Sequence, residues 1–365
     1  MPTVTANPLH KSASSAVSLP ERIYILADDL TGACDSGAAF LRTGRAVRVW
    51  LGTTAPFSAP EPVQAFNTDS RSLPPAKASR IVSRALAGLA SAPAALLFKK
   101  IDSAGRGPLA AEILSAHRAY GSRAVLLAPA FPAAGRTVRN GILEIQDVTG
   151  QRTQIDVAGL FPQRDRDLIR IVSHPEELAA ALDTGKPVLL CDSSAQLDLE
   201  SLVRVAEKFP GLLFAGSAGL AQAIASRDVR RIRRAPPPSV SRTLIVAGSD
   251  HPVTKLQLDA LDPSHARTAQ VLSLRFSRHD RTRILDAFLT FVPQALILTG
   301  GDTASLTAST LGAHSFILQG ELAPGIPWGI VQGGMAEGCI VITKSGGFGT
   351  PSVFNEILTA LRGPA

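Results

Sequence analysis

The sequence has few cysteines and no long apolar run, and each shortage excludes a class of protein. Its three cysteines, Cys34, Cys191 and Cys339, are an odd number, lie far apart and lack CxxC metal-binding spacing. They provide no disulfide framework, so we expect a reducing compartment, the cytoplasm. No apolar stretch approaches the roughly 18 to 20 residues that a membrane-spanning helix requires, so we expect no membrane association.

Aromatic residues are also scarce, at 5% of the chain, which leaves too few for a nucleic-acid stacking surface. The formal net charge is nevertheless +7. Most of the excess comes from residues 227–242, which hold six arginines and one aspartate. The same segment contains Pro236, Pro237 and Pro238, which suit neither a helix interior nor an inner strand. We interpret it as an exposed basic linker and expect no nucleic-acid partner.

Two nucleotide-binding motifs are missing. Neither GxxxxGK[ST] nor GxGxxG occurs in the chain. The sequence therefore supports neither a Walker-type NTPase nor a standard dinucleotide-binding fold. An enzyme remains compatible with the chain, because 365 residues, 45% of them hydrophobic, can form two or three domains with sizeable cores.

Strand-like runs alternate with helix-like segments on both sides of the linker. Residues 22–27 (RIYILA) are typical of a buried strand, and an Ala-rich helix is expected at 77–89. After the linker, strands are expected near Leu244, Val271, Leu296 and Ile340. This alternation predicts an α/β protein with two doubly wound, mostly parallel-sheet domains. We divide the chain into a disordered leader (1–20), an N-terminal domain (21–226), the linker (227–242) and a C-terminal domain (243–365).

Three Gly-containing turns join a strand to a helix in the C-terminal half. They are GSD at 248–250, TGGDT at 299–303 and KSGGFG at 344–349. Each offers unhindered backbone N–H groups at the positive end of a helix dipole. A single turn of this kind often only closes a tight connection, but three in one domain indicate a polyphosphate site.

Polar residues follow the expected strands of the N-terminal half, where open parallel sheets bind ligands. Asp28 and Asp29 come after the first strand, and capping the next helix would employ only one of them. Asp35, one turn further on, either orients these acids or lies at the surface. Later loops add further charged and hydroxyl side chains, namely Arg71, Lys100, Asp102, Ser103, Arg106 and Arg136. These loops describe a pocket for a small polyhydroxy anion, although the 100–106 loop reads equally well as a helix cap with solvated cations.

Seven motifs in a fixed order resemble those of the four-carbon acid sugar kinase family. They are ADDLTGACD, KKIDSAGRG, PAFPAAGRT, GSAGLA, AGSDHPVTKLQ, TGGDT and KSGGFG. The family includes D-threonate, D-erythronate and 3-oxo-tetronate kinases, and the resemblance extends from about Ile23 to the C-terminus. It implies an ATP-dependent kinase with a sugar-acid substrate domain (21–226), a nucleotide domain (243–365) and an active site in the cleft between them.

The resemblance also implies roles for single residues. It gives Asp29, Arg71 and the segment Lys100, Ile101, Asp102 and Ser103 as substrate-binding. It gives Ser249, Gly300, Gly301, Asp302, Thr303, Gly346 and Gly347 as ATP-binding. For transfer to a terminal hydroxyl, we expect Asp29 to orient or deprotonate the hydroxyl, with Asp28 beside it, and Arg106 and Arg136 to help hold the carboxylate. Mg²⁺ is expected to bridge phosphate oxygens through water and a carboxylate such as Asp302.

The chain departs from the family pattern at residues 102–108. The family usually reads DSTxRGN there, whereas this chain reads DSAGRGP, so a hydroxyl and an amide are missing. The segments after GRT and at 256–295 also look shorter. The particular sugar acid, the metal ligands and the oligomeric state, with a homodimer as one option, therefore stay open. Two other classes stay open as well: a nucleotide-dependent oxidoreductase of a small hydroxy acid, and a non-catalytic sugar-acid sensor.

Overall fold

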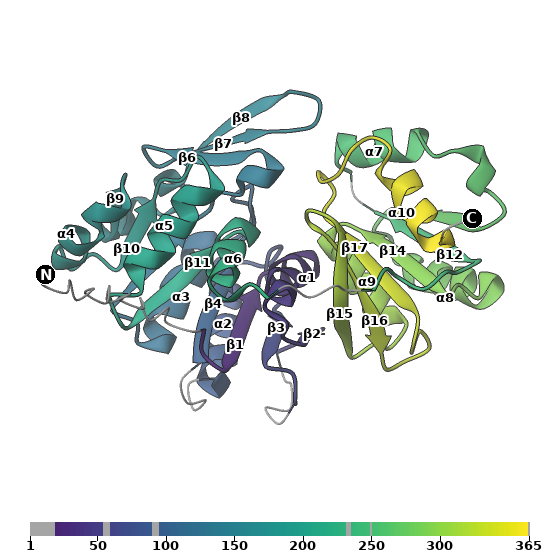
Figure 1. Ribbon diagram of the computed structural model, residues 1–365, viewed down its shortest axis with the longest axis horizontal. Helices are drawn as coiled ribbons and strands as arrows, with labels where there is room; N and C mark the ends of the chain where they lie inside the picture. Colours follow the sequence, from purple (N-terminus) through teal and green to yellow (C-terminus); the bar gives the residue numbers. More distant parts are fainter. Residues whose placement is uncertain (1–18, 54–58, 90–94, 231–234, 249, 364–365) are drawn as a thin grey trace, which may run out of the picture.

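The computed structural model describes residues 19–53, 59–89, 95–230, 235–248 and 250–363. Ser249 and the expected leader up to residue 18 lie outside these residues. Within them, the chain forms one 14-stranded sheet covered by helices, and a separate three-stranded sheet (Figure 1). The prediction of a mostly parallel α/β protein is confirmed.

Parallel strands form the N-terminal half of the large sheet, in the order β2-β3-β1-β4-β11-β5-β10-β9. Their bounds are β1 Arg22–Ala27, β2 Val47–Trp50, β3 Val63–Asn67, β4 Ala95–Lys100, β5 Ala124–Ala128, β9 Ile169–Val172, β10 Val188–Cys191 and β11 Leu212–Gly216. The helices of this half are α1 Leu30–Ala39, α2 Pro75–Leu89, α3 Leu109–Tyr120, α4 Leu178–Asp183, α5 Gln196–Ala206 and α6 Ala218–Ala225. The small sheet consists of β6 Arg136–Arg139, β7 Ile142–Gln146 and β8 Arg152–Asp156.

The C-terminal half continues the large sheet with β13-β12-β14-β17 in parallel, followed by the antiparallel strands β16 and β15. The strands are β12 Thr243–Ala247, β13 Ala269–Ser273, β14 Ala295–Thr299, β15 Ser315–Ala323, β16 Ile326–Gln332 and β17 Ile340–Lys344. The helices are α7 Pro252–Asp259, α8 Asp280–Phe291, α9 Gly301–Thr310 and α10 Val353–Arg362. In the described part of the chain, no helix combines the length and apolar character that crossing a membrane requires.

The sheets of the two halves are joined edge to edge by β2 and β15. These strands pair in antiparallel fashion, with Val49 opposite Phe316 and Val47 opposite Leu318. Neither β15, β16 nor this continuity was predicted from the sequence. The pairing brings the two halves together along one edge.

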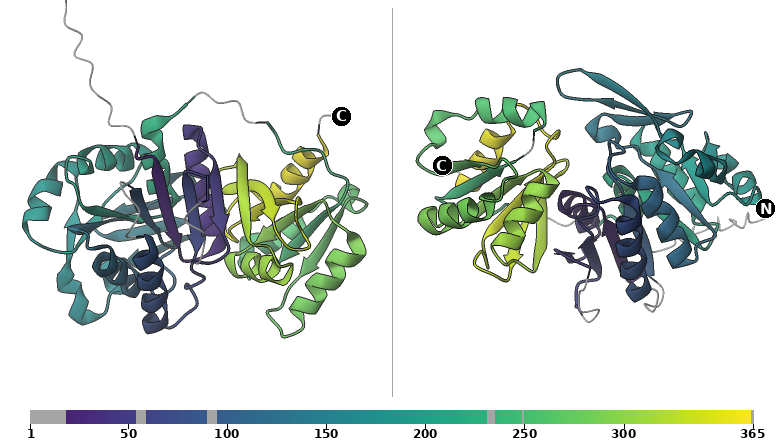
Figure 2. Two further views of the ribbon diagram at one scale, coloured as in Figure 1. Left: turned by 90° about the horizontal axis from the view of Figure 1, so that it is seen from below. Right: turned by 180° about the vertical axis from the view of Figure 1, so that it is seen from behind.

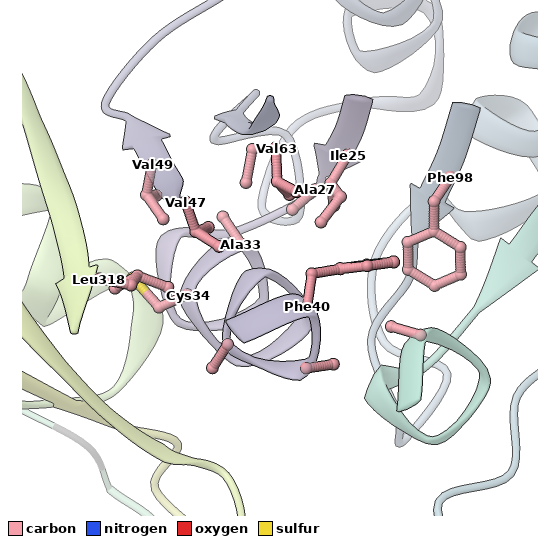
Figure 3. Packing of buried hydrophobic residues seen from close by; sticks show 14 of the residues in the cluster. Ile25, Ala27, Ala33, Cys34, Phe40, Val47, Val49, Val63, Phe98 and Leu318 are labelled. Carbon is pink, nitrogen blue, oxygen red and sulfur yellow. The ribbon is translucent and has the colours of Figure 1, made fainter. Parts of the chain in front are cut away.

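Helix α1 lies where the halves meet, and every one of its residues is buried (Figure 2). Small side chains allow this close packing. A Cβ atom at Gly37 would lie 3.1 Å from Cγ1 of Val47 and 3.3 Å from Cδ1 of Leu318. Figure 3 shows the same junction, with Cys34 of α1 next to Leu318 of the C-terminal half. The acids at the start of α1 are therefore held between the two halves.

Alternation along β1 explains why helices cover both faces of the sheet. Ile23 and Ile25 join the large apolar cluster around α1, whereas Tyr24 and Leu26 join the cluster on the opposite face. A strand that is apolar on both faces suits the interior of a parallel sheet. The polar residues that function requires are thus displaced to the loops after the strands.

Candidate active site

A cavity of about 630 Å³ lies between the two halves, at the loops that follow the strands. Its wall includes these predicted substrate residues: Asp29, Arg71, Lys100, Asp102, Ser103, Arg106 and Arg136. It also includes these predicted nucleotide residues: Gly300, Gly301, Asp302, Thr303, Gly346 and Gly347. The structure therefore brings both sets to one place, while the role of each residue stays a prediction.

Three predicted site residues are not part of the described wall. Ser249 lies outside the described residues. Asp28 is 4% exposed and accepts a 2.7 Å hydrogen bond from Nε of Arg71. Ile101 belongs to the apolar cluster that covers β1, and its carbonyl oxygen accepts a 2.6 Å hydrogen bond from Nζ of Lys100. Asp28 and Ile101 thus touch wall residues, and their predicted contacts with ligands stay predictions.

Arg71 gathers the acids of the N-terminal half. Besides Asp28, its guanidinium donates to Oδ2 of Asp29 at 2.5 Å and lies 3.4 Å from Oδ1 of Asp102. Burial is the largest influence on Asp28 and Asp102 and opposes their ionisation, but the positive charges of Arg71 and Lys100, with Arg106 at Asp102, together outweigh it and lower the pKa of both carboxyls. Arg106 also binds both oxygens of Asp102, each at 2.8 Å. The predicted role of Arg71 as a carboxylate clamp must therefore compete with three carboxylates of the protein itself.

Asp29 occupies the contact between the N-terminal and C-terminal halves. It caps α1, accepting from the backbone N–H of Gly32 and from Oγ1 of Thr31, each at 2.8 Å. On its other side lies the first residue of α9, Gly301, where a Cβ atom would come within 2.0 Å of Oδ2 of Asp29. Glycine is required at residue 301 because the carboxylate fills the place of a side chain.

The two adjacent lysines at the end of β4 point to opposite faces, as successive strand residues do. Lys100 lines the cavity. Lys99 is buried and pairs with Oε2 of Glu112 at 2.7 Å. Glu112 also accepts a 2.5 Å hydrogen bond from Oγ of Ser70, the neighbour of Arg71. Lys99 therefore supports the Arg71 loop, and Lys100 supplies positive charge to the cavity.

Arg136 is a buried cation in the wall with unused hydrogen-bonding capacity. Its Nε has no hydrogen-bond partner among the described residues, and a further nitrogen donates to the carbonyl of Ala134. Its guanidinium lies over the ring of Phe348, 4.7 Å from the centroid, and Phe348 also packs on Phe131. Burial lowers the pKa of Arg136. An aromatic ring from the C-terminal half thus packs on a cation of the N-terminal half.

The KSGGFG turn is held by its carbonyl groups. Nζ of the buried Lys344 donates to the carbonyls of Ser345, Gly346 and Phe348 at 3.0, 3.2 and 3.2 Å. Thr254 donates to the Gly346 carbonyl at 2.9 Å. Burial lowers the pKa of Lys344 to about 7. With its carbonyls engaged in this way, the turn is suited to offer N–H groups to an anion.

The start of α9 has the same character. Gly300 has a φ of 99°, which glycine adopts without strain, and the helix begins at the next residue. Its first turn contains Asp302 and Thr303, and both line the cavity. A helix N-terminus that opens into a cavity is a general phosphate-binding feature.

The small sheet contributes wall residues that were not predicted from the sequence. Ile145, Asp147, Gln151, Thr153 and Ile155 lie on or next to β7 and β8 and line the cavity. Figure 1 shows this hairpin projecting from the N-terminal half toward α7. A signal was present for part of this sheet, because the run RTVRNGILEIQ contains Asn-Gly at the turn between β6 and β7, and this pair favours a tight hairpin.

Several further wall residues had weaker signals or none. Asp35 and Phe348 lie inside recognised motifs, but neither was assigned to a ligand. His251 and Phe276 also line the cavity. Phe276 has a φ of 51°, and its ring lies beside Gly248. No sequence pattern predicts a positive φ at a phenylalanine.

Comparison with known proteins assigns the two sides of this cavity. Residues 23–179 match the model of a sugar-binding N-terminal domain, and residues 281–354 match that of a nucleotide-binding C-terminal domain. The chain is 28% identical to the D-threonate kinase of Bordetella bronchiseptica over 401 residues, covering 93% of this chain and 97% of the relative. It is 26% identical to the 3-oxo-tetronate kinase of Methylobacterium radiotolerans over 425 residues, covering 91% and 97%.

A crystal structure of a Haemophilus influenzae protein of the DUF1537 family has the same fold, with a TM-score of 0.65, 20% identity, and coverage of 93% of this chain and 100% of that one. The matches to both domains and the full-length similarity to the named kinases agree with the motifs found in the sequence. The chain belongs to the four-carbon acid sugar kinase family.

Proposed function

We propose that the protein transfers the γ-phosphoryl group of ATP to a terminal hydroxyl of a short sugar acid of about four carbons, such as threonate, erythronate or a 3-oxo-tetronate. One observation carries this proposal. A single cavity is lined by acids and cations of the sugar-binding half on one side and by glycine turns of the nucleotide-binding half on the other. The family relationship favours this reaction over the oxidoreductase and the sensor.

The phosphates of ATP would lie against the first turn of α9 and the KSGGFG turn. Both offer backbone N–H groups without an obstructing side chain at Gly300 and Gly347. The adenine base of ATP would lie toward Gly248 and Phe276. The ring of Phe276 is half-exposed in the cavity wall. A bulky residue with positive φ is strained, and such strain persists where a site requires it.

Mg²⁺ is the ion that we propose to accompany ATP. In the described part of the chain, no group of three or more His, Cys, Asp or Glu side chains is arranged to hold a metal ion. This suits an ion bound mainly by phosphate oxygens and water, with one protein carboxylate. Asp302, in the first turn of α9 and in the cavity wall, would be that carboxylate. The bound ion would neutralise charge on the phosphates.

The carboxylate of the sugar acid would bind Arg136 and Lys100. Arg136 is buried and its Nε has no hydrogen-bond partner among the described residues, so an incoming carboxylate would supply that donor with an acceptor. Lys100 adds a second positive charge across the cavity. Arg71 then acts chiefly on the acids, because its nitrogens already contact Asp28, Asp29 and Asp102.

In the transfer, the substrate hydroxyl oxygen forms a bond to the γ-phosphorus as the bond from that phosphorus to the β–γ bridging oxygen breaks. Such reactions depend on positioning and charge neutralisation. Asp29 would orient the hydroxyl, because Arg71, Thr31 and Gly32 hold its carboxylate against the start of α9.

The test is an ADP-release screen with Mg-ATP against D-threonate, D-erythronate, 3-oxo-tetronates and other aldonates of three to six carbons. We expect acid-dependent ADP release for at least one four-carbon acid. ADP release that does not depend on any acid would contradict the proposal, as would turnover only with a nicotinamide cofactor. The predicted cytoplasmic location and the option of a homodimer stay predictions, the latter to be checked by light scattering.

A further inference from the structure

Asp35 is a buried carboxylate in the cavity wall that the proposed reaction does not yet use. It lies in the second turn of α1, is 5% exposed and lines the cavity. Its Oδ1 has no hydrogen-bond partner among the described residues. Buried polar atoms are nearly always paired, so a carboxylate of the cavity wall that keeps an unpaired oxygen indicates a partner that arrives with a ligand.

Asp35 lies on the face of α1 that borders the position proposed for the substrate hydroxyl, beside Asp29. Asp35 follows Gly32 by three residues and therefore shares its face of α1. A Cβ atom at Gly32 would lie 2.9 Å from Nζ of Lys100 and 2.7 Å from Oδ1 of Asp29. Side chains on a helix lean toward its N-terminus, and the charges of Lys100 and Asp29 both act on the Asp35 carboxylate.

The two acids of α1 differ in how their oxygens are used. Both oxygens of Asp29 accept hydrogen bonds, from Gly32 and from Thr31 and Arg71. Asp35 forms no salt bridge with a described residue, and its Oδ1 is buried without a hydrogen-bond partner among them. The oxygens of Asp29 are thus held by hydrogen bonds, whereas Oδ1 of Asp35 is not, so Asp35 can accept a proton without breaking one there.

Four charged residues act on the Asp35 carboxyl. Burial raises the pKa of its carboxyl to about 7, helped by the charges of Glu321 and Asp29 and opposed by those of Lys100 and Arg136. A base that titrates near neutral pH is well matched to accepting a proton during turnover.

We propose that Asp35 is the catalytic base, which accepts the proton of the substrate hydroxyl as phosphoryl transfer occurs. The hydroxyl oxygen bonds to the γ-phosphorus, its proton passes to the carboxylate of Asp35, and ADP leaves with the electrons of the broken bond. The proton returns to water after product release. This inference rests on the proposed kinase function.

The first test compares wild type with Asp35→Asn, using the acid that gives the fastest ADP release in the screen above. We expect kcat to fall roughly 10²-fold or more, the scale of losing a general base. In wild type, kcat/KM should rise with pH through about 7, and this acid limb should be absent from the residual activity of the variant.

Folding of the variant can be checked independently. Folding raises the pKa of Asp35 above its unfolded value of about 4, so ionisation above that pH destabilises the wild-type fold. Asp35→Asn should therefore melt at the same temperature as wild type, or higher, at pH 8. Wild-type kcat with an unchanged acid limb in the folded variant overturns the inference and leaves the kinase intact.

Glu321→Gln provides a second test that leaves the cavity wall unchanged. Glu321 lies on β15 and accepts a 2.9 Å hydrogen bond from the backbone of Gly325. Because its charge raises the pKa of Asp35, its removal should move the acid limb of kcat/KM to lower pH while the plateau rate is kept. An acid limb that stays in place excludes Asp35 as the titrating group. Absence of acid-dependent ADP release in wild type would instead overturn the kinase, and this inference with it.

Discussion

Gly301→Ala tests whether the contact between Asp29 and the start of α9 controls the reaction. The added carbon would lie 2.0 Å from Oδ2 of Asp29, whereas ordinary contact begins at 3.4 Å, so one side must move by about 1.4 Å. Asp29 resists because it caps α1 and pairs with Arg71. Overpacking of this kind costs about 1 to 3 kcal/mol, and loss of the cap costs about 1 kcal/mol. Replacing glycine by alanine in a helix returns up to about 1 kcal/mol.

We therefore expect Gly301→Ala to lower the free energy of unfolding by about 1 to 3 kcal/mol, measured by urea titration. Turnover should fall more than that loss suggests, by roughly 10²-fold, because a 1 Å displacement of a positioning group has such an effect. Gly52→Ala is the matched control, since a Cβ there meets nothing within 4 Å. It should change stability by less than about 0.5 kcal/mol and leave turnover unchanged. Wild-type stability and turnover in Gly301→Ala would refute the reasoning.

Three further variants separate the parts of the proposed site. Asp29→Asn should retain its fold and ATP binding but lose roughly 10²-fold in turnover. The amide weakens the ion pair with Arg71 that holds the oxygen proposed to orient the hydroxyl. Full turnover in this variant would remove Asp29 from this role. Arg136→Ala should raise KM for the sugar acid roughly tenfold or more, with little change in KM for ATP, since a charged hydrogen bond contributes about 1.5 to 3 kcal/mol. Equal rises in both KM values would make Arg136 structural. Gly347→Val should weaken ATP binding while calorimetry without nucleotide still detects the sugar acid, because a Cβ there would lie 2.9 Å from the His251 ring. Unchanged ATP affinity in the folded variant would exclude this turn from the nucleotide site.

Local patterns predicted the fold class and the convergence of most site residues. Apolar runs such as residues 22–27 mark parallel strands, and a parallel sheet places the loops after its strands on one edge. That rule is enough to bring Asp29, Lys100 and Gly301 to one cavity, as the structure has them.

Long-range pairing was beyond these patterns. Residues 47–50 and 315–318 pair across the whole chain, and periodicity within either strand cannot specify its distant partner. The association of Arg71 with three acids is likewise a product of tertiary packing. Asp35 was left between two roles in the sequence because burial, not residue type, separates a surface acid from a buried one.

The most direct test of the central claim is ³¹P NMR of the product formed from Mg-ATP and the sugar acid that supports turnover. The account predicts one new phosphate monoester, coupled to the protons of the terminal carbon, which grows in step with ADP. Inorganic phosphate alone, or a phosphoryl group on the carboxylate, would contradict it.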